Sequence, residues 1–81
     1  MKIKLIAFGI AKDVFGASTQ LEVNDSMTLA ELSAYLKDHY SASNQLPVCR
    51  MAVNQEIVED IKTFVLKDGD EVAILPPVSG G

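Results

Sequence analysis

The residues with the clearest chemical potential are the last six, which read PPVSGG. Pro76 and Pro77 hold φ near −65°, which predicts a stiff, extended segment. Six extended residues reach about 20 Å. Gly80 and Gly81 have no Cβ, so a carboxylate at Gly81 could enter a channel too narrow for any other residue. Activation as an acyl-adenylate would make that carboxylate an electrophile for a sulfur or nitrogen nucleophile.

We therefore predict that this tail carries one reactive carbonyl, that of Gly81, on a thin tether between active sites. The residues expected to thread into partner active sites are Pro76, Pro77, Val78, Ser79 and Gly80.

Other residues able to do chemistry fit structural roles better. Cys49 lies among apolar neighbours in VCRMAV, which predicts a buried thiol in the middle of a strand. His39 is expected near a helix C-terminus, where it would interact with the helix dipole. Asp68 and Asp70 flank Gly69 as turn residues. With one His and one Cys, the spacing offers no metal centre, and no glycine-rich phosphate loop is present, so we expect no metal and no bound cofactor.

Length and charge narrow the possible functions. A chain of 81 residues predicts one domain with a thin core. The net charge of −4 lies wholly in residues 51–81, and no basic stripe suited to nucleic acid is visible. The acidic half suits a basic protein partner, although it could equally serve solubility alone. A single Cys and the lack of a signal peptide or membrane span predict a cytoplasmic protein.

Hydrophobic patterns predict the elements that position the tail. Strands are expected at 2–10, 19–23, 48–54 and 71–75, and an amphipathic helix at 29–40, where Thr28 and Glu31 form a capping box. Residues 12–18 are expected to be a connection, 41–47 a polar loop and 67–70 a tight turn. Residues 55–66 are ambiguous between a short irregular strand and a helical turn.

The order β-β-α-β-(short element)-β predicts an α+β protein with the β-grasp, ubiquitin-like fold, in which one main helix packs on one face of a mixed sheet. Residues 1–75 would form this domain and residues 76–81 its extended tail.

The face of the sheet away from the helix is expected to be apolar as well. Ile6 and Phe8 alternate with Ile3 and Leu5, and VAIL at 72–75 is apolar on both faces. An apolar strip beside the tail predicts a partner-binding surface.

The runs LKDGDEVAILPPVSGG, AVNQEIV and KIKLIAFGIAKDVFG closely resemble the small subunits of molybdopterin synthase, over essentially the whole chain. The resemblance implies a sulfur carrier. An ATP-consuming enzyme related to ubiquitin-activating enzymes would adenylate Gly81, and a sulfurtransferase would supply the sulfur of a thiocarboxylate. The large synthase subunit would pass that sulfur to cyclic pyranopterin monophosphate, which builds the dithiolene of molybdopterin. Two small and two large subunits would form a heterotetramer with its catalytic residues on the large subunit, so the chain alone would not be an enzyme.

The resemblance also implies roles for particular positions. Phe8, Ile57 and Leu75 match positions of the family's hydrophobic contact with its partners, and Lys12 stands where a basic residue often contacts the large subunit. Leu75 stands where the family frequently has Phe. Lys12 stands where the family often has Arg, and a lysine cannot make the two parallel hydrogen bonds of a guanidinium group.

Three alternatives stay open from the sequence. A thiamine-pathway sulfur carrier would share the fold and the Gly-Gly ending, although PPVSGG favours the molybdopterin pathway. A ubiquitin-like modifier would use the same activated glycine to form isopeptide bonds with lysines. A plain interaction domain would make no chemical use of its tail.

Overall fold

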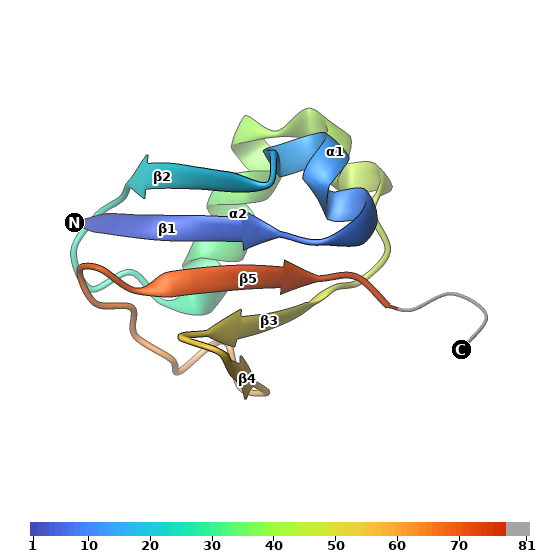
Figure 1. Cartoon of the computed structure of the whole chain (residues 1–81). Coiled ribbons are helices and arrows are strands. Elements are labelled where there is room, and N and C mark those ends of the chain that lie inside the picture. The colour runs from blue at the N-terminus through green and yellow to red at the C-terminus, as the bar shows by residue number, and fades with distance from the viewer. Residues whose placement is uncertain (78–81) are drawn as a thin grey trace.

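The computed structural model describes residues 1–77, which form a mixed five-stranded sheet with one long helix on one face (Figure 1). The elements are β1 (Lys2–Ala7), α1 (Lys12–Phe15), β2 (Ser18–Glu22), α2 (Leu29–His39), β3 (Arg50–Val53), β4 (Glu56–Val58) and β5 (Glu71–Leu75), with 3-10 helices at Gly9–Ala11 and Ser41–Gln45. The strand order is β2-β1-β5-β3-β4. The predicted β-grasp architecture is therefore confirmed.

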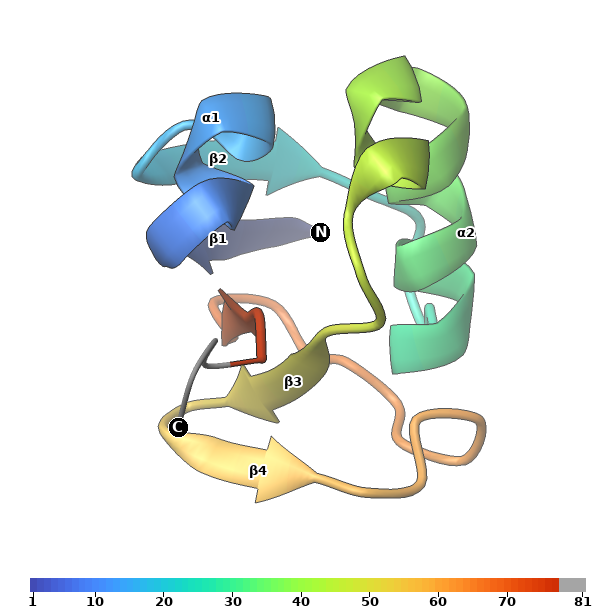
Figure 2. The ribbon, with the colours of Figure 1, turned by 90° about the vertical axis from the view of Figure 1, so that its right-hand side faces the viewer.

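The centre of the sheet is a parallel pair formed by β1 and β5. An antiparallel hairpin adds β2 to β1, and β3 runs antiparallel to β5 with β4 beyond it. Parallel strands need a crossover connection, and the chain between β2 and β3 contains the helix α2 that covers one face. Figure 2 shows α2 on one side of the strands only.

The core lies between α2 and the sheet. The helix contributes Leu29, Leu32 and Leu36, which recur at helical spacing and are buried. In β1 the alternation of the strand turns Ile3 and Leu5 toward this layer, where each is only 1% exposed. The apolar residues that recur at helical and strand spacing therefore pack together in a single core.

Two predicted strands are shorter in the structure. The first ends at Ala7 because Gly9, with φ of 54°, turns the chain into a 3-10 helix. The third begins at Arg50, opposite Leu75, where β5 ends. Pro76 has no N–H to continue the ladder, so residues 48 and 49 find no strand partner there.

Two predicted connections contain helical turns. Residues Lys12–Phe15 form the one-turn helix α1, and its Phe15 is buried. Ser41–Gln45 form a 3-10 helix where a polar loop was predicted. Short apolar or serine-rich runs carry too little periodicity to show such single turns in the sequence.

The ambiguous segment 55–66 begins with a strand. Asn54 and Gln55 both have positive φ, 51° and 73°, which form a tight hairpin turn between β3 and β4. Beyond β4 the chain crosses the start of α2, where Phe64 O accepts from Leu29 N at 2.9 Å and Ile61 O accepts from Ala30 N at 2.9 Å. This segment thus satisfies backbone donors that a helix N-terminus leaves free.

The turn before β5 confirms the structural role of its aspartates. Gly69 has φ of 87°, a conformation that favours glycine. Asp68 accepts from Lys2 N at 2.7 Å, and Asp70 accepts from Lys67 N at 2.8 Å. The Asp68 bond anchors the turn to the start of β1, and the Asp70 bond closes the turn itself.

Across residues 1–77, no helix combines the length and the apolar character that crossing a membrane requires.

The capping box at the start of α2 gives a first prediction. Thr28 Oγ1 accepts from Glu31 N at 3.1 Å, and the Glu31 carboxylate accepts from Thr28 N at 2.8 Å. We expect Thr28→Ala to lower the free energy of unfolding by about 1 kcal/mol. For a domain of this size that loss lowers Tm by about 4–8 °C. Thr63→Ala, at an exposed turn threonine, is the matched control. Equal losses in both variants would show that the cap contributes nothing.

The same pair predicts a pH effect. The backbone N–H of Thr28, and secondly its hydroxyl, lower the pKa of Glu31. Stabilisation from a lowered carboxyl pKa is complete above the ordinary value and is lost as the pH falls through the folded value. Thr28→Ala keeps this N–H and removes only the hydroxyl, so it should raise the Glu31 pKa through the secondary cause alone, measured by carbon NMR of its side chain. The difference in unfolding free energy from the native chain should narrow in acid without closing, because the bond from Glu31 N to Thr28 Oγ1 does not titrate. A difference in unfolding free energy between the two chains that stays constant down to acid pH would contradict this prediction.

Candidate functional site: an apolar strip beside the root of the tail

One row of apolar side chains crosses the sheet on the face away from α2. In the strand register Ile6 lies opposite Ala73, Ala73 opposite Ala52, and Ala52 opposite Ile57. Residues opposite one another in paired strands point to the same face. Four strands thus contribute to one continuous apolar row.

A second pair of apolar residues lies at the end of this row. Phe8 follows β1 in extended conformation and donates its N–H to Ile74 O at 3.3 Å. Leu75 is the last residue of β5. Strand alternation places both on the face of Ile6 and Ala73. We call the whole set the apolar strip, and its members are Ile6, Phe8, Ala52, Ile57, Ala73 and Leu75.

The strip is a surface and not a second core. Phe8 is 46% exposed and Ile57 is 44% exposed, whereas Val72 and Ile74 of β5, which face α2, are buried. Ala52, between the core residues Met51 and Val53, is only 5% exposed but lies outside the core cluster. Ala52 and Ala73 place little side-chain bulk in the middle of the strip. Large exposed apolar side chains around small central ones are suited to receive a protein partner.

Charged groups border the strip at the end nearest the tail. Arg50 lies opposite Leu75 and forms an ion pair with Glu59. Both side chains are largely exposed, so the pair adds little to stability. An apolar centre with a polar rim is the usual composition of a protein–protein interface.

The strip runs directly into the root of the tail. Leu75 immediately precedes Pro76, which is half-buried, and Pro77, which is exposed. A Cβ built on Gly9 would lie 3.9 Å from Pro76 Cγ, so the connection after β1 lies beside the tail root. Figure 1 shows that the chain leaves β5 at the end of the sheet where α1 lies.

The structure brings the predicted partner contacts to one face and one end of the molecule. Phe8, Ile57 and Leu75 belong to the apolar strip, and Lys12 is the exposed first residue of α1, beyond the Gly9 connection. Their contacts with partners stay predictions. Val78, Ser79, Gly80 and Gly81 lie outside the described residues, so the predicted threading and chemistry of the tail are not tested.

Cys49 departs from its predicted setting. It precedes β3 and is only partly buried, because the ladder with β5 stops at Arg50. Its Sγ–H donates to Pro47 O at 3.2 Å, and partial burial raises the pKa of the thiol. A raised pKa keeps the thiol protonated at neutral pH, so Cys49 is a poor nucleophile.

His39 lies in the last turn of α2, as predicted. Its ring stacks on Tyr35 with 3.9 Å between centroids, and its Nδ1 lies 3.0 Å from Tyr35 O. A donor at this place satisfies a carbonyl near the helix C-terminus. Within residues 1–77, no three His, Cys, Asp or Glu side chains gather where they could hold a metal ion.

Residue patterns alone did not indicate two parts of this surface. Ala52 carries no signal in the sequence that distinguishes it from a core residue. Ile57 was predicted only through the family resemblance, because the strand that carries it has three residues, too few to show alternation.

Comparison with known proteins agrees with the geometry. The model of the ThiS family matches residues 5–81. The molybdopterin synthase sulfur carrier subunit of Chlamydomonas reinhardtii is 39% identical to this chain, and the alignment covers 100% of both proteins. The protein of the same name from Dictyostelium discoideum is 36% identical, with 99% of this chain and 96% of that protein aligned.

Solved structures show the same fold. A chain in the complex of subunits 1 and 2 of molybdopterin-converting factor from Helicobacter pylori is 32% identical over 100% of both chains, with a TM-score of 0.72. SAMP1 from Haloferax volcanii superposes with a TM-score of 0.81 at 20% identity, again over 100% of both chains, and supports the fold alone. The resemblance to molybdopterin synthase small subunits is confirmed, and the chain belongs to the ThiS family, with the ubiquitin-like β-grasp fold.

Proposed function

We propose that this chain is the sulfur carrier subunit of a molybdopterin synthase and that Gly81 carries the sulfur as a thiocarboxylate. The full-length similarity to curated sulfur carrier subunits supports the assignment. The observation that carries this assignment is that the apolar strip is continuous with the tail, because Leu75 of the strip is followed directly by Pro76. A partner bound on the strip would receive the tail at its edge.

The chemistry takes place at the carbonyl carbon of Gly81. Its carboxylate attacks the α-phosphate of ATP in an activating enzyme, which forms the acyl-adenylate and releases pyrophosphate. A sulfur nucleophile at the oxidation level of sulfide, supplied by a sulfurtransferase, then forms the C–S bond as the C–O bond to AMP breaks. In the active site of the large subunit the thiocarboxylate sulfur would bond to a side-chain carbon of cyclic pyranopterin monophosphate, with loss of an oxygen substituent from that carbon. Water would then cleave the C–S bond to the Gly81 carbonyl, which leaves the sulfur on the pterin and returns the carboxylate.

The residues of this chain would bind the partner proteins and position the tail, and the partners would supply the catalytic groups. Phe8, Ile57 and Leu75 would dock the large subunit or the activating enzyme, and Lys12 would pair with an acidic group of the large subunit. The two prolines would direct the tail away from the sheet. The acidic segment 51–81 would favour partners with a basic docking surface. Two small and two large subunits would make the assembled enzyme.

The remaining alternatives differ in where the activated carbonyl goes. A ubiquitin-like modifier would leave Gly81 in an isopeptide bond with lysine, and a thiamine-pathway carrier would load sulfur but would not bind the large synthase subunit. The full-length relatives named as molybdopterin synthase sulfur carrier subunits favour the first assignment.

Sulfur loading is tested by intact mass. Incubation of the full chain with the activating enzyme, ATP and a sulfur source should raise its mass by about 16 Da, since one oxygen is replaced by sulfur. The control is the chain without Gly81, which should melt like the native chain because β5 ends at Leu75. An unchanged mass of the native chain, or adducts on lysines of other proteins alone, would refute the carrier assignment.

Docking on the strip is tested by Phe8→Ala. Loss of an exposed interface aromatic should weaken large-subunit binding by about 30-fold or more, since such residues contribute about 2 kcal/mol or more. Its effect on urea unfolding should stay well below that of Leu5→Ala, for which burial predicts a loss of about 2–5 kcal/mol. Calorimetry with the large subunit gives the affinity. Val65→Ala is the matched surface control, since Val65 is 49% exposed and lies beside Thr28.

Unchanged binding of Phe8→Ala together with a strongly lowered urea midpoint would place Phe8 in the core and remove the strip from the docking surface.

A further inference from the structure

The strand β4 (Glu56–Val58) forms one border of the sheet, and its outer edge has no neighbouring strand within the described chain. Figure 2 shows β4 at this border, with the chain that follows it turning back toward α2. An edge of this kind presents main-chain donors and acceptors that can pair with another extended chain. The edge is only three residues long, so any selectivity for a partner must come from the side chains around it.

The turn between β3 and β4 decides which main-chain groups of β4 point outward. Asn54 and Gln55 form a two-residue hairpin turn, so Val53 and Glu56 face each other across it and exchange hydrogen bonds. Hydrogen-bonded and non-hydrogen-bonded pairs alternate along an antiparallel ladder. The N–H and C=O of Ile57 therefore point away from β3, and no loop in the described chain forms a backbone hydrogen bond with them.

A hollow of about 540 Å³ lies along this edge, between β4 and the segment 60–64, and we call it the edge groove. Strand alternation turns Glu56 and Val58 to the face that α2 covers, and Phe64 of the following segment lies beside them in the groove. Val58 and Phe64 are half-buried and pack against the core. The groove thus offers a fixed apolar floor to a side chain of any segment paired with β4.

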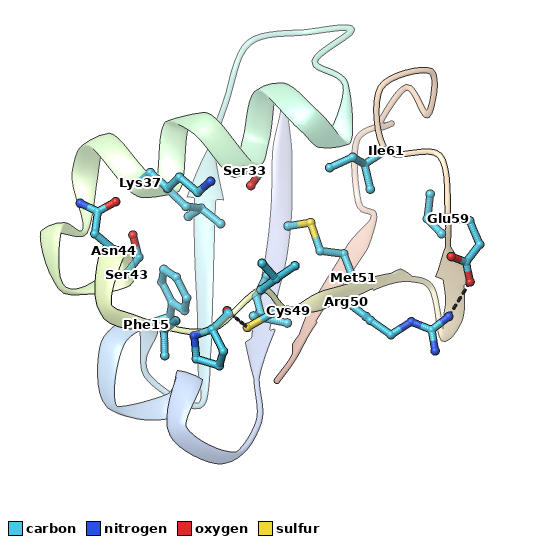
Figure 3. Close-up of a pocket in the computed structure, with 16 residues that line it drawn as sticks. Phe15, Ser33, Lys37, Ser43, Asn44, Cys49, Arg50, Met51, Glu59 and Ile61 are labelled. Atoms are coloured by element: carbon cyan, nitrogen blue, oxygen red, sulfur yellow. Dashed lines mark hydrogen bonds and ion pairs between the residues drawn. The ribbon is translucent and has the colours of Figure 1, made fainter. Parts of the chain in front are cut away.

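The edge groove carries negative charge without a balancing cation. Glu56 and Asp60 line it, and no lysine or arginine of the described chain does. Neither carboxylate takes part in the two ion pairs that residues 1–77 form. The neighbouring acid Glu59 is already balanced, because it pairs with Arg50 (Figure 3). Lys62 donates its backbone N–H to Asp60 at 3.2 Å, but its side chain does not line the groove.

These charges argue against a second copy of this chain as the occupant of the edge. Pairing of β4 with β4 of another copy would bring Glu56 and Asp60 of both chains together. Like charges opposite one another in paired strands are destabilising. A basic segment of another protein has the complementary charge.

We propose that β4 and the edge groove bind an extended segment of a partner protein, in which apolar residues are flanked by lysine or arginine. One residue of the segment exchanges both main-chain hydrogen bonds with Ile57 and adds its side chain to the end of the apolar strip. In antiparallel pairing its two neighbours face the groove, where an apolar one lies against Val58 and a basic one pairs with Glu56. A second basic residue, two positions before the apolar neighbour, lies beside Asp60. The tail takes no part, so the proposal goes beyond the sulfur-carrier function.

The test uses the synthetic peptide acetyl-Ser-Lys-Thr-Val-Val-Lys-Ser-amide, whose second valine is designed to lie opposite Ile57. Titration into the full-length, nitrogen-15-labelled chain should give saturable amide shifts centred on residues 56–64, and these shifts give the dissociation constant. The amide hydrogen of Ile57 should exchange with solvent more slowly at saturation, because it becomes the donor of a hydrogen bond.

Two altered peptides separate the main-chain and charge contributions. Proline in place of the second valine removes the N–H that donates to Ile57 O, and should weaken binding about 3–10-fold. Glutamate in place of both lysines should abolish saturable binding, because the peptide then meets Glu56 and Asp60 with like charge.

Variants of the chain test the two carboxylates. Glu56→Gln and Asp60→Asn should each weaken binding of the lysine peptide about 2–5-fold, since an exposed ion pair contributes up to about 1 kcal/mol. Glu22→Gln, at an exposed glutamate of the opposite edge strand β2, is the matched control and should leave binding unchanged.

Several results would overturn the proposal. These are the absence of saturable shifts, shifts centred on Phe8 and Leu75, equal binding of the lysine and glutamate peptides, or an Ile57 amide whose exchange is unaffected at saturation. Shifts of residues 56–60 that depend on protein concentration without peptide would make a second copy the occupant instead. Deletion of Gly81 should not alter peptide binding, so failure of this test and failure of sulfur loading are separate observations.

Discussion

The parallel pairing of β1 with β5 is the constraint on which the rest of the molecule depends. Parallel strands end at the same edge of the sheet, so Phe8, after β1, comes beside Leu75, at the end of β5. The tail therefore leaves from the edge at which the first strand turns into α1. Because this pair joins the two ends of the chain, the crossover helix α2 and the later strands must be accommodated between them.

The register of this pair also divides the apolar residues between two faces. A shift of one residue would exchange the two sides of a strand. Val72 and Ile74 face α2 and are buried, while Ala73 and Leu75 face away. A domain of this size has one helix to cover one face, so an apolar second face stays exposed unless a partner covers it. Alternate residues of the central strand β5 thus serve two purposes: one set stabilises the core, and the other set forms part of a docking surface.

Pro76 ends the pairing of β5 with β3 and so affects the chain on both strands. Because it cannot donate to the ladder, β5 ends at Leu75 and β3 begins at Arg50. The chain before Arg50 is then free of the sheet, and its Leu46 and Cys49 line a cavity of about 500 Å³ on the helix side. One missing N–H therefore separates the tail from the domain and also leaves the chain before Arg50 outside the sheet.

Local signals in the sequence were sufficient for much of this protein. The capping box of Thr28, the aspartates beside Gly69 and the strand at 71–75 each depend on residues within a few positions of one another, and the structure has all three. The order of elements then leaves the β-grasp arrangement as the natural solution. Only the tertiary structure decided that Ile57 joins Ala52 on the strip and that Cys49 lies outside β3. It alone also decided that the Ser43 hydroxyl is buried with no hydrogen-bond partner among residues 1–77. These features depend on contacts between segments distant in the sequence, whose register and termination no local pattern encodes.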